Sequence, residues 1–254
     1  MNAVSVVRLV ARMLSTGVAF ACIHASAAEI RVLAPNAAKE SVTEAILSFE
    51  KSSGHKVTIS WSGTEAITKR IAEGEIVDVV VNAAQNIDRL TTDGKLSQGS
   101  RTDFARSSVG AAVAPSAPRP DISSTEGLKA ALLAAKSIVI SSGTSGRYLS
   151  ELFVKLGVSE QIKAKVKQPP SGAQIGDFLA AGEAELGFQQ VSELIHVKGI
   201  QFLGPLPAEL QNYTIYAGAA HSQASQPEAA RALLKALRQP ETAAVVKKSG
   251  MEPL

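Results

Sequence analysis

The chain has 254 residues, 45% of them hydrophobic and only 4% aromatic, and a formal net charge of +3. This near balance of charge excludes a nucleic-acid-binding protein, because phosphate contacts need clustered Lys and Arg. A single cysteine, Cys22, and four histidines without metal-ligand spacing exclude a disulfide framework and predict neither a metal site nor a cofactor.

The first 28 residues have the pattern of a secretory signal peptide. Arg8 and Arg12 precede an apolar run at 13–23, and Ala25-Ser26-Ala27 provides the small residues that signal peptidase recognises. The run is too short for a bilayer, which takes about 20 apolar residues. We therefore expect the chain to be exported to a bacterial periplasm. A lipoprotein modified at Cys22 and a buried N-terminal helix are the alternatives.

Beyond this segment, β-branched runs alternate with helical patterns, which predicts an α/β fold. Strands are expected at 30–34, 57–61, 77–81, 109–114, 137–141, 186–189 and 213–217. Helices are expected at 39–52, 86–90, 127–135, 147–156, 227–237 and 241–248. One more helix is expected to run from 64 to a C-cap at 74, and another to end at 181. Loops are expected at 115–120 and 204–207. The continuous apolar run at 77–81 is typical of a parallel strand covered on both faces.

Three of these strands end in small polar residues where a helix begins. The turns are Asn36-Ala37, Ser62-Gly63-Thr64 and the segment 142–146, which contains Thr144, Ser145 and Gly146. A helix N-terminus presents free N–H groups and a partial positive charge. Three such turns at one cleft would bind a small anion without a metal. The alternative is that these side chains only cap their helices.

The order and spacing of these segments resemble the molybdate-binding periplasmic proteins of ABC transporters. The resemblance covers nearly all of the chain after the signal peptide. It rests on Arg31-Val32-Leu33-Ala34, on Gly63-Thr64 with Arg70 to Gly74, on 77–83, on Ser145-Gly146-Arg147-Tyr148 and on 181–187.

The resemblance implies a type 2 periplasmic-binding-protein fold, in which two α/β lobes joined by crossing strands close over an anion. Lobe one is expected at 29–108 plus 217–254, and lobe two at 109–216. In that family hydroxyls, backbone amides and a tyrosine hold the oxyanion. The corresponding positions here are Ala37, Thr64, Ser145, the region of Gly172, and Gln190.

Two of these positions depart from the family pattern. Ala37 stands where a ligand serine is expected, and Gln190 stands where the family has the tyrosine. Glu65 occupies a usually small position beside the anion, where its charge would repel molybdate. Arg70 and Arg147 follow two of the turns, and arginine binds carboxylates through two parallel hydrogen bonds. We therefore expect an organic di- or tricarboxylate to bind better than molybdate, although both arginines could also be solvated surface charges.

The expected ligand-binding residues combine the turns, the family positions and the two arginines. They are Asn36, Ala37, Ser62, Gly63, Thr64, Arg70, Thr144, Ser145, Gly146, Arg147, Gly172 and Gln190.

The predicted function is a soluble, monomeric periplasmic solute-binding protein that captures a small anion for an ABC transporter permease. An isomerase is the alternative, because the scaffold also resembles that of bacterial aconitate isomerases. An allylic proton shift would need a base, for which Glu65 is the candidate and Tyr148 a possible second group. Glu65 could instead be a first-turn residue favoured by the helix dipole. A sensor or adhesion role is the third possibility.

Overall fold

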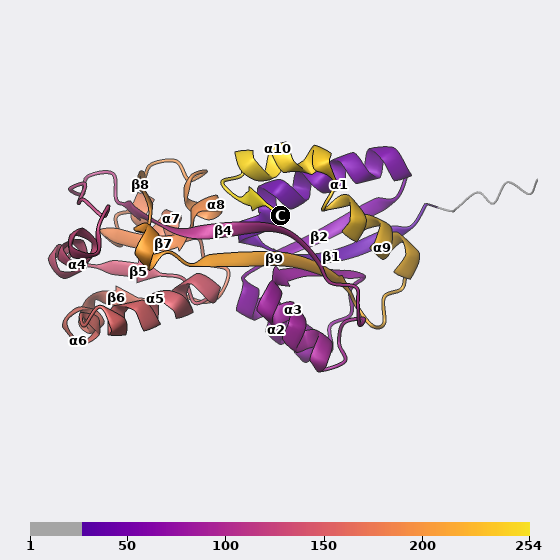
Figure 1. Cartoon of the computed structure of the whole chain (residues 1–254), viewed down its shortest axis with the longest axis horizontal. Coiled ribbons are helices and arrows are strands. Elements are labelled where there is room, and N and C mark those ends of the chain that lie inside the picture. Colours follow the sequence, from indigo (N-terminus) through magenta and orange to yellow (C-terminus); the bar gives the residue numbers. More distant parts are fainter. Residues whose placement is uncertain (1–26) are drawn as a thin grey trace, which may run out of the picture.

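The computed structural model describes residues 27–254, so nearly all of the expected signal peptide lies outside the described residues. Two α/β lobes lie end to end, and two long strands, β4 (Thr102–Val113) and β9 (Tyr213–Ala220), run between them (Figure 1). This architecture confirms the expected α/β fold with two lobes.

Lobe one is built on the parallel strands β1 (Glu29–Pro35), β2 (Lys56–Ser62) and β3 (Val79–Ala83), with β9 antiparallel to β3. Its helices are α1 (Lys39–Ser53), α2 (Thr64–Ala72), α3 (Ala84–Thr92), α9 (Pro227–Ala236) and α10 (Pro240–Lys248). Strand β3 is buried along its whole length. Val79 and Val81 pack into the cluster with α1 and α9, whereas Val80 packs with α2 and α3. A strand covered on both faces was expected here, and it lies two positions later than 77–81.

Lobe two contains the strands β5 (Ile138–Ile140), β6 (Val166–Lys167), β7 (Leu186–Gln190) and β8 (Gln201–Pro205). Its helices are α4 (Thr125–Ala134), α5 (Thr144–Lys155), α6 (Ser159–Ile162), α7 (Ile175–Ala180) and α8 (Val191–Leu194). Short 3-10 turns, η1 (Asn36–Ala38), η2 (Lys163–Lys165) and η3 (Ala208–Leu210), and the strand β10 (Glu252–Pro253) complete the elements of the described chain.

Strand β4 changes partners along its length. Its first part, from Thr102 to Ser108, pairs with β9 in lobe one, and its second part, from Val109 to Val113, pairs with β7 and β8 in lobe two. The sheet therefore runs in the order β2-β1-β3-β9-β4-β7-β5-β6. The division into lobe one at 29–108 plus 217–254 and lobe two at 109–216 stays a proposal, and this change of partners supports it.

Two of the differences from the sequence expectation have a clear physical reason. Strand β4 begins at Thr102 rather than at 109. The sequence pattern missed its first half because that half is rich in polar residues and lacks the apolar run that indicates a buried strand. Strand β8 extends to Pro205, into the segment expected as a loop at 204–207. β8 pairs only with β4, and a proline is tolerated on such an edge strand because no further strand needs its missing N–H.

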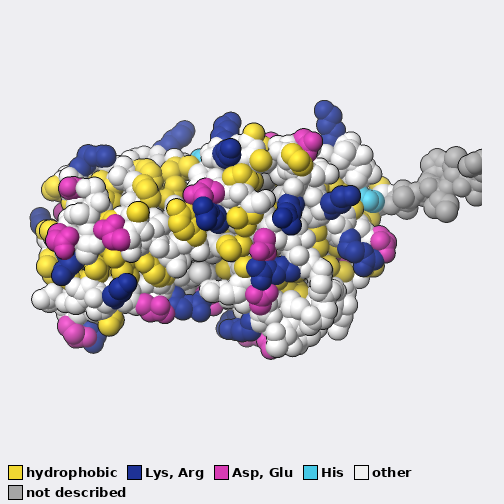
Figure 2. All heavy atoms as spheres, viewed as in Figure 1, with side chains coloured by type: hydrophobic (Ala, Val, Ile, Leu, Met, Phe, Trp, Pro, Cys, Tyr) yellow, Lys and Arg dark blue, Asp and Glu magenta, His cyan; other side chains and the backbone are white. Residues whose placement is uncertain are grey.

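The surface carries charges of both signs. On the face shown in Figure 2, Lys and Arg side chains lie among Asp and Glu, and neither sign forms a continuous field. Within residues 27–254, no helix combines the length and the apolar character needed to cross a bilayer.

Asp78 is a fully buried carboxylate that ties the start of β1 to the segment before α9. It accepts hydrogen bonds from the backbone N–H of Arg31 at 2.8 Å, the hydroxyl of Ser225 at 2.8 Å and the backbone N–H of Gln226 at 3.0 Å. Burial by itself would raise the pKa of Asp78, but these hydrogen bonds outweigh it, so the pKa lies below its usual value.

We expect Asp78→Ala to reduce the free energy of unfolding by about 2–3 kcal/mol at pH 7, because two backbone N–H groups and the Ser225 hydroxyl would lose a charged acceptor. The carboxylate stabilises the fold above the pKa of an unfolded Asp, about 4, and this contribution is lost as the pH falls through the lower pKa of the folded state. Urea unfolding at pH 7 and pH 3 measures both effects. Asp93→Ala removes an exposed carboxylate and should change little. Equal losses in the two variants would contradict the prediction.

Candidate functional site

A small cavity lies between the lobes, and we call it the interlobe cavity. Lobe one and β9 line it with Pro35, Asn36, Ala37, Gly63, Thr64 and Tyr216. Lobe two lines it with Ser141, Ser142, Gly143, Thr144, Ser145, Pro170, Ser171, Gly172, Ala173, Gln189, Gln190 and Glu193. Its volume is about 30 Å³. The cavity lies beyond the carboxyl ends of β1, β2, β5 and β7, where α/β proteins usually bind their ligands.

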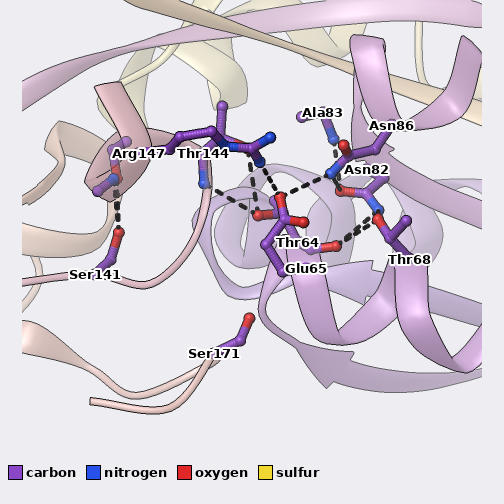
Figure 3. A network of polar contacts seen from close by, with 12 residues as sticks. Thr64, Glu65, Thr68, Asn82, Ala83, Asn86, Ser141, Thr144, Arg147 and Ser171 are labelled. Carbon is purple, nitrogen blue, oxygen red and sulfur yellow. Dashed lines mark hydrogen bonds and ion pairs between the residues drawn. The ribbon is translucent and has the colours of Figure 1, made fainter. Parts of the chain in front are cut away.

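The N-termini of α2 and α5 meet at this cavity from opposite lobes. The hydroxyls of Thr64 and Thr144 are 3.4 Å apart, and the N–H of Thr144 donates to the Thr64 hydroxyl, also at 3.4 Å (Figure 3). Within the described chain, the backbone N–H groups of Thr64 and Ser145 have no acceptor. Two first-turn N–H groups are thus available to an anion, with the positive ends of two helix dipoles behind them.

Ser142 adds a third group without a partner. Its hydroxyl oxygen is buried, and no other group in residues 27–254 forms a hydrogen bond with it. The neighbouring Ser141 hydroxyl differs, because it interacts with the Ser145 hydroxyl at 2.9 Å and accepts from the N–H of Gly146 at 3.2 Å (Figure 3). Buried polar groups are rarely left unpaired, so the Ser142 hydroxyl is a candidate ligand contact.

Several polar contacts hold the two lobes together around the cavity. The amide of Asn36 donates to the carbonyl of Gly172 at 3.0 Å, and the Ser171 hydroxyl accepts from the N–H of Ala66 at 3.2 Å. At the rim, Arg147 of α5 forms an ion pair with Glu65 of α2 (Figure 3). The structure therefore has the two lobes closed on each other.

Many of the expected ligand-binding residues line the interlobe cavity, namely Asn36, Ala37, Gly63, Thr64, Thr144, Ser145, Gly172 and Gln190. Ser62, Gly146 and the two arginines do not line it. Arg70 lies six residues along α2 from Thr64, or about 9 Å at 1.5 Å per residue. It pairs there with Glu75 through contacts of 2.5 and 2.6 Å. Arg147 is at the rim, where Glu65 neutralises it.

The two residues considered for proton transfer also lie outside the cavity lining. Glu65 pairs with Arg147 and accepts from the Asn86 amide at 3.4 Å. Tyr148 packs against the core of lobe two and donates its hydroxyl to the carbonyl of Leu210 at 2.7 Å. Both remain predictions for the site, but the closed structure gives neither of them a position inside the cavity.

Gln190 is buried in the lining and also contacts the strands that join the lobes. In the amide orientation that satisfies both of its polar atoms, it donates to the carbonyls of Ser107 and Ser108 at 3.1 and 3.2 Å and accepts from the Thr214 hydroxyl at 2.8 Å. Gln190 thus links the end of β7 to the crossing segments of β4 and β9.

The sequence reasoning missed the two titratable residues that do line the cavity, Glu193 on α8 and Tyr216 on β9. Burial raises the pKa of Glu193 to about 8. Burial, together with the nearby Glu193 charge, raises the pKa of Tyr216 well above its usual value. No Lys or Arg of the described chain lines the cavity, so at neutral pH its interior offers uncharged hydrogen-bonding groups and a mostly protonated carboxyl group.

The raised pKa of the partly buried Glu193 predicts that the stability of the fold depends on pH. Its pKa is raised above that of an unfolded Glu, so the fold is unaffected below about pH 4.5 and loses stability as the pH rises to about 8, where the folded carboxyl ionises. Glu193→Gln should remove this decline, so that the variant unfolds at a higher temperature than the parent at pH 9 and at a similar temperature at pH 4.5. Thermal unfolding across this range tests it. The exposed Glu183→Gln serves as control, and a decline that persists in Glu193→Gln would contradict the prediction.

Two α/β lobes joined by crossing strands and closed over a cavity of amide and hydroxyl groups define a solute-binding protein of the two-lobed periplasmic type. The model of one family, described as bacterial extracellular solute-binding protein, matches residues 30–252. The chain belongs to this family.

Individual relatives are of two kinds. An aconitate isomerase from a Pseudomonas species is 36% identical over 231 residues, which cover 89% of this chain and 88% of that protein. A molybdate-binding protein from Azotobacter vinelandii is 30% identical over 174 residues, covering 67% of this chain and 68% of that protein. Among solved structures, the Azotobacter vinelandii periplasmic molybdate-binding protein superposes with a TM-score of 0.73 at 19% identity, covering 87% of this chain and 98% of that one.

Proposed function

We propose that the chain binds a small unsaturated tricarboxylate between the lobes, at the interlobe cavity, and isomerises it by an allylic proton shift. The closed cavity of about 30 Å³ has room for about one water molecule, so the lobes must part to admit this substrate and close around it less tightly than in this structure. The observation that carries this proposal is a titratable pair, Glu193 and Tyr216, facing a cavity otherwise lined by neutral groups. Carboxyl groups with strongly raised pKa values in a cleft are characteristic of proton-transfer sites. The aconitate isomerase, which matches along most of both chains, supports the same reaction class.

The cavity also suits the charge of such a substrate. Carboxylates would accept hydrogen bonds from the free N–H groups of Thr64 and Ser145 and from the Ser142 hydroxyl. Donors that are already oriented stabilise the charge that develops during a proton shift without further reorganisation. At neutral pH most molecules carry a protonated Glu193, which does not repel the anion, and a minority carry the ionised form that can act as a base.

Incubation of the chain from residue 29 onward with trans-aconitate in D₂O tests the proposal. We expect proton NMR to show the cis isomer and deuterium entering the methylene position. Lys248→Ala, in α10 and outside the cavity lining, should behave like the parent and serves as the control. The absence of both cis isomer and deuterium would overturn the isomerase proposal.

Capture of a small anion for a transporter is the second candidate function, and membership of the solute-binding family favours it. In that case the chain would work as a soluble monomer in the periplasm and deliver its ligand to an ABC permease. Calorimetry with citrate, trans-aconitate, molybdate and tungstate distinguishes the ligands. We expect the carboxylates to bind more tightly, because Ala37 and Gln190 supply neither the hydroxyl nor the phenol of an oxyanion cage. Tight molybdate binding with no response to carboxylates would overturn this preference.

A further inference from the structure

We propose that Glu193 is the catalytic residue that carries the proton, and that Gln189 positions its carboxyl group. This inference rests on the proposed isomerisation. Nothing in the sequence marks Glu193, which is an ordinary first-turn residue of the four-residue helix α8. Its assignment comes from its place in the cavity lining at the carboxyl end of β7.

Gln189 fixes the orientation of the carboxyl group. Its amide N–H donates to Oε1 of Glu193 at 2.8 Å, and its own amide oxygen accepts from the N–H of Ile175 at 3.0 Å. The second carboxyl oxygen, Oε2, receives no hydrogen bond from any group in residues 27–254. One oxygen is thus held by the protein, and the other is free to exchange a proton with a ligand.

The other candidates are less suited to this role. Tyr216 is the second titratable residue of the lining, but its pKa is raised well above its usual value, so it keeps its proton and does not act as the base. Glu65 is engaged with Arg147 at the rim. None of the three histidines of the described chain, His55, His196 and His221, lines the cavity.

The proposed step conserves atoms and electrons. Oε2 of ionised Glu193 removes a proton from the methylene carbon, and the C–H electron pair forms a double bond to the central carbon. The former double-bond pair takes a proton from the Glu193 carboxyl at the far carbon, so the base is regenerated and no oxidant or reductant is needed. A carboxyl pKa of about 8 suits this role, because a group that must both accept and donate works best near the ambient pH.

The test compares the parent with Glu193→Gln and Glu193→Asp, and uses the exposed Glu183→Gln as the matched control. Glu193→Gln should lower the turnover of trans-aconitate by about 1,000-fold, within the range typical of a lost general base. It should leave the Kd for trans-aconitate within about threefold, because glutamine resembles the protonated carboxyl. Glu193→Asp should retain measurable turnover, because it keeps a carboxyl group at a greater distance. In the parent, kcat should rise with pH and reach a plateau above about pH 8.

The outcomes distinguish a failure of the role of Glu193 from a failure of the proposed isomerisation. If the parent interconverts the isomers and Glu193→Gln does so within tenfold of it, the role of Glu193 is overturned and the isomerisation stands. If the parent shows no turnover, the proposed function fails and the role of Glu193 fails with it. If Glu193→Gln does not fold, the pH profile of the parent and the turnover of Glu193→Asp test the role of Glu193 instead. A kcat independent of pH between 6 and 9 would overturn the role.

Discussion

Gly63→Ala should weaken ligand binding at least 100-fold while leaving both lobes folded. A Cβ at this position would lie 2.2 Å from the Ser171 hydroxyl oxygen and 2.3 Å from the backbone nitrogen of Gly172, both in the opposite lobe. Gly63 itself has φ −85° and ψ 155°, which alanine adopts without strain. The methyl group therefore obstructs only the closed arrangement. A 100-fold loss corresponds to about 2.7 kcal/mol, the free energy by which closure would be disfavoured.

Calorimetry with trans-aconitate or citrate measures the loss, and small-angle scattering should show a larger radius of gyration for Gly63→Ala in the presence of ligand. Gly143→Ala provides a graded comparison. Its Cβ would lie 3.0 Å from the Thr64 hydroxyl oxygen, which a side-chain rotation can relieve, and 3.9 Å from the Ser141 hydroxyl oxygen, an ordinary contact, so its effect should be much smaller. Undiminished affinity in Gly63→Ala would show that binding does not require this closed arrangement.

Gly146→Ala should destabilise lobe two by about 3 kcal/mol, the upper part of the range for overpacking. Its Cβ would lie 1.5 Å from the carbonyl oxygen of Ser141 and 2.5 Å from the carbonyl carbon, so the backbone before α5 has to move. The same movement would displace the Ser142 hydroxyl and the Ser145 N–H, and ligand affinity should fall with stability.

Urea unfolding compares Gly146→Ala with Ser150→Ala, one turn further along α5. Ser150 is exposed and donates its hydroxyl to the Gly146 carbonyl at 3.0 Å, a local contact whose removal should cost little. A Gly146→Ala variant as stable as the parent would mean that the turn relaxes without cost.

The strand-to-helix turns were predictable because their signal is local. Small polar residues after an apolar strand mark the start of a helix, and the carboxyl ends of strands converge in an α/β lobe. This reasoning predicted cavity-lining residues such as Thr64, Ser145 and Gly172 from both lobes. It also placed Arg70 at the site, and this part stays a prediction, because in the closed structure Arg70 lies almost two turns along α2 from Thr64 and pairs with Glu75.

The proton-transfer candidates could not be chosen from local pattern. Glu65 directly follows Thr64 in sequence, but its side chain pairs with Arg147 across the lobes, and such a pairing depends on how the lobes close. The segment that leads from β7 into α8 and Glu193 begins with Gln189-Gln190 rather than with a turn such as Ser-Gly-Thr, so it lacks the composition that marked the other turns. Its raised pKa comes from burial, which only the assembled fold creates.

The order in which the chain builds lobe one has a consequence for its synthesis. The buried cluster that contains Ile30 and Val32 of β1 also contains Leu233 of α9 and Met251, which lies just before β10. Ile30 and Val32 are more than 200 positions away from Leu233 and Met251 in the sequence. The ribosome therefore synthesises all of lobe two between the two groups. The first strands have α1 beside them early, but they lack α9 and α10 until translation is nearly finished, and contacts between such distant segments form slowly. If the chain is exported, as its N-terminal pattern predicts, such a delay would leave the polypeptide unfolded while it passes through a translocation pore.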